Sequence, residues 1–218
     1  MKNKNIVLIS IILIIVVFIL GSVYYQKNED VKASKVTINN LNDAPFIRNH
    51  SPKFGNITSS ITIVEFLDPS CGACKSFHPI LKKVFNEYKN DIKLVIRYLA
   101  NHKSSKFAIR VLEASRSQDK FNEVLEIIFA NQSKWSSHYG GAKEEVLWSA
   151  LEKNSNIDIE KLKRDFNDNY IDGILNLDSN DAQSLKVRGT PTVFINGREL
   201  KKLDYNSLSL SIEEEVYK

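Results

Sequence analysis

Hydrophobic residues are distributed unevenly along the chain, and the longest apolar run lies near the N-terminus. Residues 6–25 read IVLISIILIIVVFILGSVYY and contain no charged residue, and Lys2 and Lys4 precede them. A helix of about 20 residues spans the hydrocarbon core of a bilayer, which is about 30 Å thick. Lysines before such a run and tyrosines at its end favour an orientation with the N-terminus inside the cell. We therefore predict a transmembrane anchor over residues 1–25.

A cleavable signal peptide is the alternative interpretation of this segment. Signal peptides normally have an apolar region of about 7–15 residues that ends in a small-residue cleavage site. The run here is longer, and Leu20-Gly21-Ser22 is a poor match to such a site. Both interpretations carry the rest of the chain out of the cytoplasm. We expect a single-pass protein of the cell (inner) membrane whose folded domain faces the periplasm or the cell exterior.

The periodic patterns of a folded domain begin only after a polar stretch. Residues 26–43 have neither helical nor strand periodicity and predict a linker between the anchor and the domain. The folded domain is then expected over residues 44–218. Short runs of β-branched and apolar residues predict strands at 61–67, 92–99 and 192–195.

Helical periodicity dominates the rest of this domain. Apolar positions within residues 77–88 recur every three or four residues and predict a helix after the first strand. Similar stripes between about 102 and 186 predict a large helical block, and a last stripe at 208–216 predicts a C-terminal helix. Asn196-Gly197, a dipeptide typical of tight hairpins, connects the last long strand to a short partner at 198–200. This order of elements predicts an α/β sheet with a helical insertion.

Composition and charge exclude several classes of protein. The 218 residues are 43% hydrophobic and 26% charged, values typical of a globular chain and not of a disordered one. The net charge of +4 is mild, and no basic stripe is present, so we do not expect a nucleic-acid partner. The two cysteines are too few for a disulfide scaffold or for a four-cysteine metal site.

Both cysteines lie in one short motif, Cys71-Gly72-Ala73-Cys74, where a predicted strand passes into a predicted helix. Backbone N–H groups and the dipole at a helix N-terminus stabilise an anion, so Cys71 is expected to have a lowered pKa. Cys74, one turn further into the helix, is then the resolving thiol of a redox pair. A purely structural disulfide would close only a very small loop and would restrain little chain entropy.

The segment Phe66–Pro79 resembles the active-site segment of thioredoxin-fold proteins. The resemblance aligns Glu65 with a buried acid beneath the cysteines, although a strand glutamate usually points outward to solvent. If Glu65 is buried, its pKa is raised and it can relay a proton to or from Cys74. The stretch from Val187 to Gly197 resembles the loop whose cis-proline faces the cysteines. By this match the cis residue is Pro191, and the backbone of Thr190 before it is available to pair with a substrate peptide.

The spacing of these motifs indicates a particular branch of the superfamily. Cys71 and Pro191 are 120 residues apart, far more than in plain thioredoxins. A helical block inserted between the strands is typical of the DsbA-like thiol:disulfide oxidoreductases, which this chain resembles over nearly all of residues 44–218. The stretch from Arg48 to Gly55 resembles the lead-in of their membrane-tethered relatives. The resemblance implies a thioredoxin fold with an inserted helical subdomain.

The resemblance also implies a function without a bound cofactor. The Cys71–Cys74 disulfide would be donated to thiols of exported proteins, and a DsbB-like membrane partner would reoxidise the pair. Many strongly oxidising relatives have Pro-His between the cysteines, whereas Gly72-Ala73 offers no side-chain donor, so the oxidising power could be lower. A reductase or isomerase of the same fold is one alternative. A copper metallochaperone that binds Cu(I) through Cys71 and Cys74, with His78 as a third ligand, is another.

Overall fold

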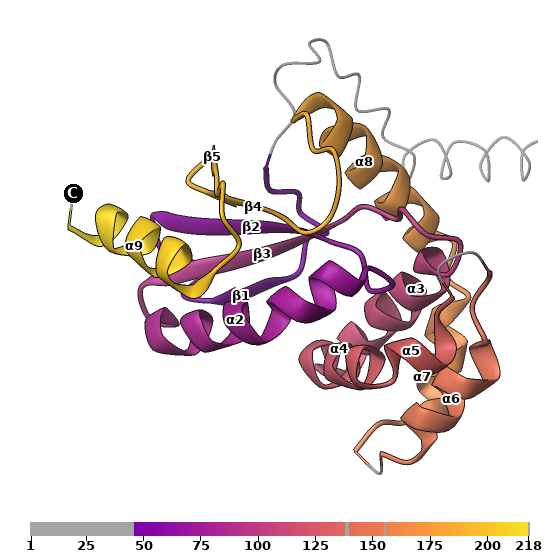
Figure 1. Cartoon of the computed structure of the whole chain (residues 1–218). Helices are drawn as coiled ribbons and strands as arrows, with labels where there is room; N and C mark the ends of the chain where they lie inside the picture. The colour runs from indigo at the N-terminus through magenta and orange to yellow at the C-terminus, as the bar shows by residue number, and fades with distance from the viewer. Residues whose placement is uncertain (1–45, 138–139, 155, 218) are drawn as a thin grey trace, which may run out of the picture. The chain divides into compact units, whose positions relative to one another are not determined.

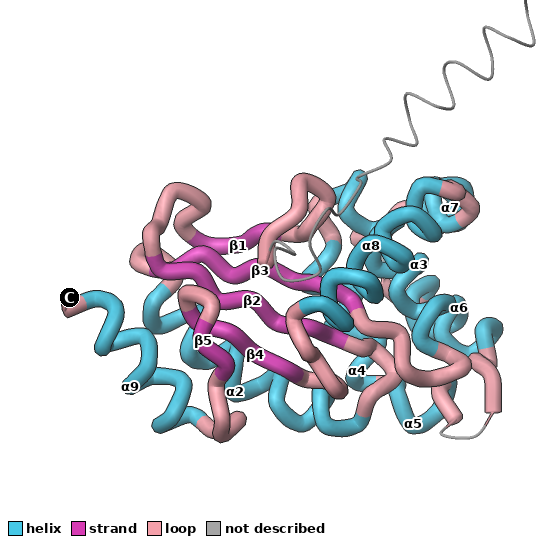
Figure 2. Tube along the Cα trace, turned by 90° about the horizontal axis from the view of Figure 1, so that it is seen from above, coloured by secondary structure: helices cyan, strands magenta, loops and turns pink. Residues whose placement is uncertain are grey.

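A five-stranded mixed sheet carries the candidate site. The computed structural model describes residues 46–137, 140–154 and 156–217, so the predicted anchor (1–25) and linker (26–43) lie outside the described residues. The strand order is β1-β3-β2-β4-β5 (Figure 2). The strands are β1 (Lys53–Gly55), β2 (Ile61–Leu67), β3 (Ile92–Tyr98), β4 (Thr192–Ile195) and β5 (Arg198–Glu199).

The two central strands are parallel and are buried on both faces. β2 pairs with β3 in parallel from Ile61 opposite Ile92 to Leu67 opposite Tyr98, and β4 pairs with β2 antiparallel. Strands covered on both faces are nearly continuous apolar runs. ITIVEFL fits this pattern apart from Glu65, and IKLVIRY fits it apart from Lys93 and Arg97. Two of these exceptions, Glu65 and Arg97, are themselves buried.

Helices cover both faces of the sheet. The helix α2 (Gly72–Tyr88) connects β2 to β3 and, together with α9 (Tyr205–Val216), covers one face, whereas α8 (Tyr170–Ser184) packs against β3 (Figure 1). The two faces have separate apolar clusters: Ile63 and Leu67 belong to the larger one, and Val64 and Phe66 belong to the smaller one. This alternation along β2 directs every second side chain toward α2.

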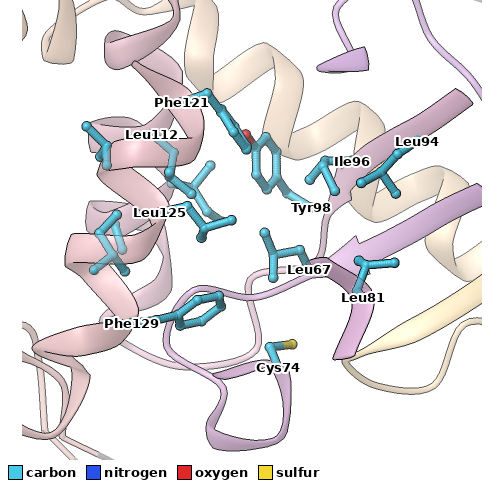
Figure 3. Packing of buried hydrophobic residues seen from close by; sticks show 14 of the residues in the cluster. Leu67, Cys74, Leu81, Leu94, Ile96, Tyr98, Leu112, Phe121, Leu125 and Phe129 are labelled. Carbon is cyan, nitrogen blue, oxygen red and sulfur yellow. The ribbon is translucent and has the colours of Figure 1, made fainter. Parts of the chain in front are cut away.

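The remaining helices form a group at one end of the sheet (Figure 2). They are α3 (Ser105–Ser115), the 3₁₀ turn η1 (Arg116–Gln118), α4 (Phe121–Ala130), α5 (Gln132–Trp135), α6 (Glu144–Glu152) and α7 (Ile159–Phe166). The predicted helical block is confirmed, but its last helix, α8, returns to the sheet. Apolar side chains of α3 and α4 join the larger cluster together with Leu81 of α2 and Ile96 of β3 (Figure 3).

The sequence pattern predicted the hairpin of β4 and β5 but not the first strand, β1. Asn196 and Gly197 both have positive φ, 46° and 79°, as the tight turn between β4 and β5 requires. β1 was not predicted, because its three residues, KFG, carry no periodic signal. Within the described part of the chain, no helix is both long enough and apolar enough to cross a membrane.

Candidate active site

Cys71 lies at the N-terminal end of α2, the helix that follows the central strand β2. β2 ends at Leu67, and a short turn brings the chain to Cys71, the N-cap of α2, with φ −77° and ψ 123°. The turn is closed by the Cys71 N–H, which donates to the Asp68 carbonyl at 3.0 Å. The first turn of α2 contains no acidic residue. Its positive dipole end is therefore available to the Cys71 sulfur.

The two thiols have opposite acidities. Both cysteines are free; Cys71 is 8% exposed and Cys74 is completely buried. The pKa of Cys71 is lowered to about 5, chiefly by the hydrogen bond from the Cys74 thiol, against the effect of burial, and also by the backbone N–H groups of Cys74 and Ala73. The pKa of Cys74 is raised, because Cys74 gives that hydrogen bond and is buried. At neutral pH the pair therefore holds one thiolate and one thiol.

The loop before β4 lies against Cys71. The Thr190–Pro191 peptide bond is cis, as the resemblance predicted. In its protonated form, the Cys71 thiol donates to the Thr190 carbonyl at 3.2 Å, across 119 residues of sequence. The Thr190 side chain also lowers the pKa of Cys71 through a hydrogen bond. The predicted juxtaposition of the cysteine motif with Thr190 and Pro191 is thus present.

Glu65 is buried in β2 on the face that packs against α2. It is 2% exposed, so the outward-facing alternative is wrong. Its Oε1 atom is buried without a hydrogen-bond partner, and burial raises its pKa from 4.5 to about 8. The charge of Glu65 in turn contributes to the raised pKa of Cys74. The ionisation of Glu65 and the ionisation of Cys74 are therefore coupled.

The two residues between the cysteines face solvent. Gly72 and Ala73 are both exposed, and a Cβ atom added at Gly72 would meet no other atom within 4 Å. Neither contributes a side-chain donor to the Cys71 sulfur. The low pKa of Cys71 therefore depends on the backbone, Cys74 and Thr190.

His78 has partners of its own. Its Nε2 atom lies 3.0 Å from Oε1 of Glu126 in α4, and its ring packs against Phe129 with centroids 5.1 Å apart. Glu126 also accepts a hydrogen bond from Lys82 at 2.6 Å. No group of three or more His, Cys, Asp and Glu residues in the described ranges could hold a metal ion. His78 is thus a packing residue, and its side chain contacts α4 of the helical insertion.

Sequence reasoning missed Asp68, which organises the turn before Cys71. The Asp68 carboxylate is buried, and its Oδ1 atom has one backbone partner, whereas its Oδ2 atom has one backbone and two side-chain partners. The donors or partners are the N–H of Ser70 (2.8 Å), the N–H of Asn101 (3.0 Å), Nδ1 of His102 (2.7 Å) and Oγ of Ser105 (2.8 Å). The only sequence signal was an acidic residue at the end of a buried strand.

Gln132 is a second residue that sequence reasoning missed. It lies in α5, is 7% exposed, and its Nε2 atom donates to the carbonyls of Pro69 (2.9 Å) and Cys71 (3.0 Å). One amide thus attaches the cysteine turn to the inserted helices. No local motif marks this residue, because its partners are more than 60 residues away in the sequence.

Comparison with known proteins agrees with this geometry. Residues 48–214 match the family model described as thioredoxin. A Bacillus cereus protein named "Probable disulfide bond formation protein D" is 28% identical over 227 residues, which cover all of both chains. A Bacillus subtilis protein named "Disulfide bond formation protein D" is 25% identical and covers 76% of this chain and 77% of its own length.

Solved structures have the same fold. The oxidised form of BdbD from Bacillus subtilis has a TM-score of 0.68 and 24% identity, covering 78% of this chain and 94% of that one. The thiol-disulfide exchange protein α-DsbA2 from Wolbachia pipientis has a TM-score of 0.61 and 27% identity, covering 76% and 87%. The chain belongs to the thioredoxin family, as a DsbA-like thiol:disulfide oxidoreductase.

Proposed function

We propose that this protein donates its Cys71–Cys74 disulfide to thiols of exported proteins. The observation that carries the proposal is the difference in acidity between the two cysteines: the Cys71 pKa is lowered to about 5 and the Cys74 pKa is raised. A stabilised Cys71 thiolate stabilises the reduced form. A protein whose reduced form is the more stable one is an oxidant.

The first step is attack on the disulfide by a substrate thiolate. It attacks the Cys71 sulfur and forms a mixed disulfide, and the bond between Cys71 and Cys74 breaks. Cys74 leaves as a thiolate in a buried position that disfavours the charge. Glu65, whose pKa of about 8 keeps it largely protonated at neutral pH, supplies the proton to Cys74.

The second step releases the oxidised substrate. A second substrate thiolate attacks the substrate sulfur of the mixed disulfide, and Cys71 leaves as the stabilised thiolate. The substrate dithiol has lost two electrons, and the cysteine pair has gained them. The Thr190 carbonyl, 3.2 Å from the Cys71 sulfur, supports a role for the Thr190 and Pro191 loop in pairing with the substrate backbone.

Export and recycling complete the proposal. Residues 1–25 anchor the chain in the cell membrane, residues 26–43 are the linker, and residues 44–218 form the catalytic domain outside the cytoplasm. A DsbB-like membrane partner accepts the two electrons and restores the disulfide. The names of the Bacillus relatives, which describe disulfide bond formation, favour this direction over reduction.

Two alternatives remain as outcomes of the test. A reductase or isomerase would use the same cysteines with electrons flowing the other way. A Cu(I) chaperone is less well supported, because His78, the third ligand in that hypothesis, pairs with Glu126. Loading with Cu(I) would abolish thiol reactivity in a chaperone, and His78→Ala would weaken binding.

The thiol–disulfide equilibrium of the full-length chain with glutathione tests the direction. A reduction potential near that of DsbA, about −120 mV, supports a disulfide donor, and one near that of thioredoxin, about −270 mV, contradicts it. The Cys71→Ser variant is the control, because it has no disulfide to exchange. A donor must also oxidise a reduced, unfolded substrate protein in the absence of glutathione.

A further inference from the structure

A cleft lies between α2, the sheet and α4, on the same face of β2 as Glu65. Its volume is about 290 Å³. Leu81 of α2 and Leu94 and Ile96 of β3 line one side, and Phe121 and Leu125 of α4 line the other (Figure 3). The cleft is large enough for several water molecules.

The inner end of this cleft contains the unpartnered carboxyl group of Glu65. Glu65 is one of the lining residues, it is 2% exposed, and its Oε1 atom is buried without a partner in the described structure. A buried polar atom without a partner is destabilising, because it has lost its hydrogen bonds to water. A water molecule hydrogen-bonded to Oε1 would remove this cost.

The rim of the cleft is polar and charged. A hydrogen-bonded group consisting of His78, Glu126 and Lys82 bridges α2 and α4 at this point, with His78 to Glu126 at 3.0 Å and Lys82 to Glu126 at 2.6 Å. The titratable groups that face the cleft, besides Glu65, are His78, Lys82, Glu123 and Glu126. Asn86 and Asn122 add exposed amides. Water at the rim would therefore have hydrogen-bond partners.

We propose that this cleft is the path by which protons pass between bulk water and Glu65 during disulfide exchange. The proposal rests on the proposed function, in which Glu65 gives a proton to Cys74. After that transfer Glu65 is a carboxylate and must regain a proton from water. The lining residues include neither cysteine nor any residue of the Thr190 loop. Contact of a substrate with Cys71 and the Thr190 loop therefore does not itself occupy the cleft.

With this path, proton transfer to Glu65 and binding of the substrate use different parts of the domain. In the donor direction each cycle moves one proton inward through the cleft, from water to Glu65 and then to the Cys74 thiolate. When the pair is reoxidised, Glu65 first releases its proton to water by the same route and then accepts the proton of Cys74. The cysteine face has to accommodate only sulfur chemistry and the substrate backbone.

Variants that fill the cleft test the path. Leu125→Trp places a larger apolar side chain at a buried lining position, and Asn122→Trp places one at the exposed rim, where the fold tolerates substitution more easily. Ala130→Trp is the matched control, because Ala130 is exposed on the same helix but does not line the cleft. Glu65→Gln removes the proton donor itself.

The experiment uses the full-length oxidised protein and a reduced dithiol peptide in weakly buffered solution. Stopped-flow fluorescence follows formation of the mixed disulfide. A pH-indicator dye follows the net proton exchange with water, in which each peptide thiol releases one proton when it becomes a thiolate and Glu65 takes one up. We expect Glu65→Gln to slow the release of Cys74 by about 100-fold, the lower end of the contribution of general acid catalysis, and the filled cleft to slow it by about tenfold. Leu125→Trp should have no further effect in the Glu65→Gln background.

A second readout does not depend on turnover. Carbon-13 NMR of the Glu65 carboxyl reports its pKa, and expelling water from the cleft should raise that pKa above its value in the parent protein and in Ala130→Trp. If both cleft variants keep the parent rate and the parent Glu65 pKa while Glu65→Gln is slow, protons take another path and the proposal fails. If Glu65→Gln itself keeps the parent rate, the role of Glu65 fails first, and the exchange of disulfides by Cys71 and Cys74 is still measured separately.

Discussion

Cys71 and Glu65 have pKa values displaced in opposite directions, and each displacement has a local cause. The N-terminal end of α2 and the Cys74 thiol stabilise a negative charge on Cys71, whose pKa is lowered to about 5. Glu65 lies in the centre of the sheet without a partner for Oε1, and burial raises its pKa to about 8. One residue is ionised and the other is protonated at the same pH. This is the arrangement that a thiolate nucleophile and a proton donor require.

These two shifts predict how stability depends on pH. In the reduced protein, the Cys71 thiolate contributes stability that is complete above pH 9.0 and is lost as the pH falls toward 5. Glu65 contributes stability that is complete below pH 4.5 and is lost as the pH rises toward 8. Between pH 5 and pH 8 the two contributions have opposite slopes and nearly cancel. The oxidised protein has no thiolate, so only the loss due to Glu65 remains.

The difference in free energy of unfolding between the reduced and oxidised forms should therefore widen from pH 5 to pH 8. Each group changes the free energy of unfolding by at most about 1.4 kcal/mol per pH unit. Urea unfolding of both redox forms across this range measures the difference. In Glu65→Gln the oxidised form should lose its pH dependence while the widening persists. A constant difference would mean that the Cys71 pKa is not lowered in the folded protein.

The resolving role that we propose for Cys74 leads to a second prediction at the residue scale. Cys74 is completely buried, whereas Cys71 is 8% exposed. Substitution of Cys74 by Ser should therefore leave a reactive Cys71 that forms mixed disulfides but cannot expel the partner. Mass spectrometry under non-reducing conditions should detect the trapped species with Cys74→Ser and not with Cys71→Ser. Equal trapping by both variants would contradict the assigned order of attack.

At the scale of elements, the cysteine turn is held by the inserted helices as well as by its own strand and helix. Gln132 of α5 donates to the carbonyls of Pro69 and Cys71 from a buried position. Asp68 connects the same turn to Asn101, which follows β3, and to Ser105, the first residue of α3. The helical insertion thus supplies buried hydrogen-bond donors that fix the conformation of the cysteine turn.

Gln132→Ala should loosen this turn without unfolding the domain. Loss of the buried amide removes its hydrogen bonds to two buried carbonyls, at an expected cost of about 1–3 kcal/mol in the free energy of unfolding. We also expect the pKa of Cys71 to rise toward its ordinary value, because its N-cap geometry becomes less fixed. Iodoacetamide alkylation rates against pH measure that pKa. Gln183→Ala, at an exposed position of α8, is the control and should change neither quantity.

The elements themselves were largely predictable from the sequence, whereas the contacts between them were not. The strand 61–67, the helix ending at Tyr88 and the hairpin at Asn196-Gly197 follow local periodicity and turn chemistry, and the structure confirms them. The resemblance to thioredoxin-fold proteins identified Glu65, but only the fold decides that it is buried. Asp68 and Gln132 were not predicted, because all their partners except Ser70 lie 33 to 63 residues away in the sequence.

At the scale of the whole described domain, a buried ion network joins the segment before β1 to the sheet and α8. Arg97 of β3 donates to Asp178 (2.8 Å) and Asp181 (2.5 Å) of α8, and Arg48 donates to both oxygens of Asp181 at 2.8 Å. His50 lies 2.7 Å from Asp178. Burial opposes ionisation of Asp181, but the hydrogen bonds from Arg48 and Arg97 lower its pKa below 3.8. The carboxylate therefore persists in the core.

Removing one charge of this network should destabilise the fold far more than removing a charge at the surface. Asp181→Asn removes the carboxylate to which both Arg48 and Arg97 donate. Breaking a buried ion pair lowers the free energy of unfolding by about 3–5 kcal/mol. Asp172→Asn is the matched control, because the same substitution in the same helix affects a half-exposed carboxylate paired with Lys106 and Arg110. Such exposed pairs contribute at most about 1 kcal/mol. Urea unfolding of both variants compares the two costs. Equal costs would mean that Arg97 and Arg48 are solvated in the folded protein, and the segment before β1 would then be held by its apolar contacts alone.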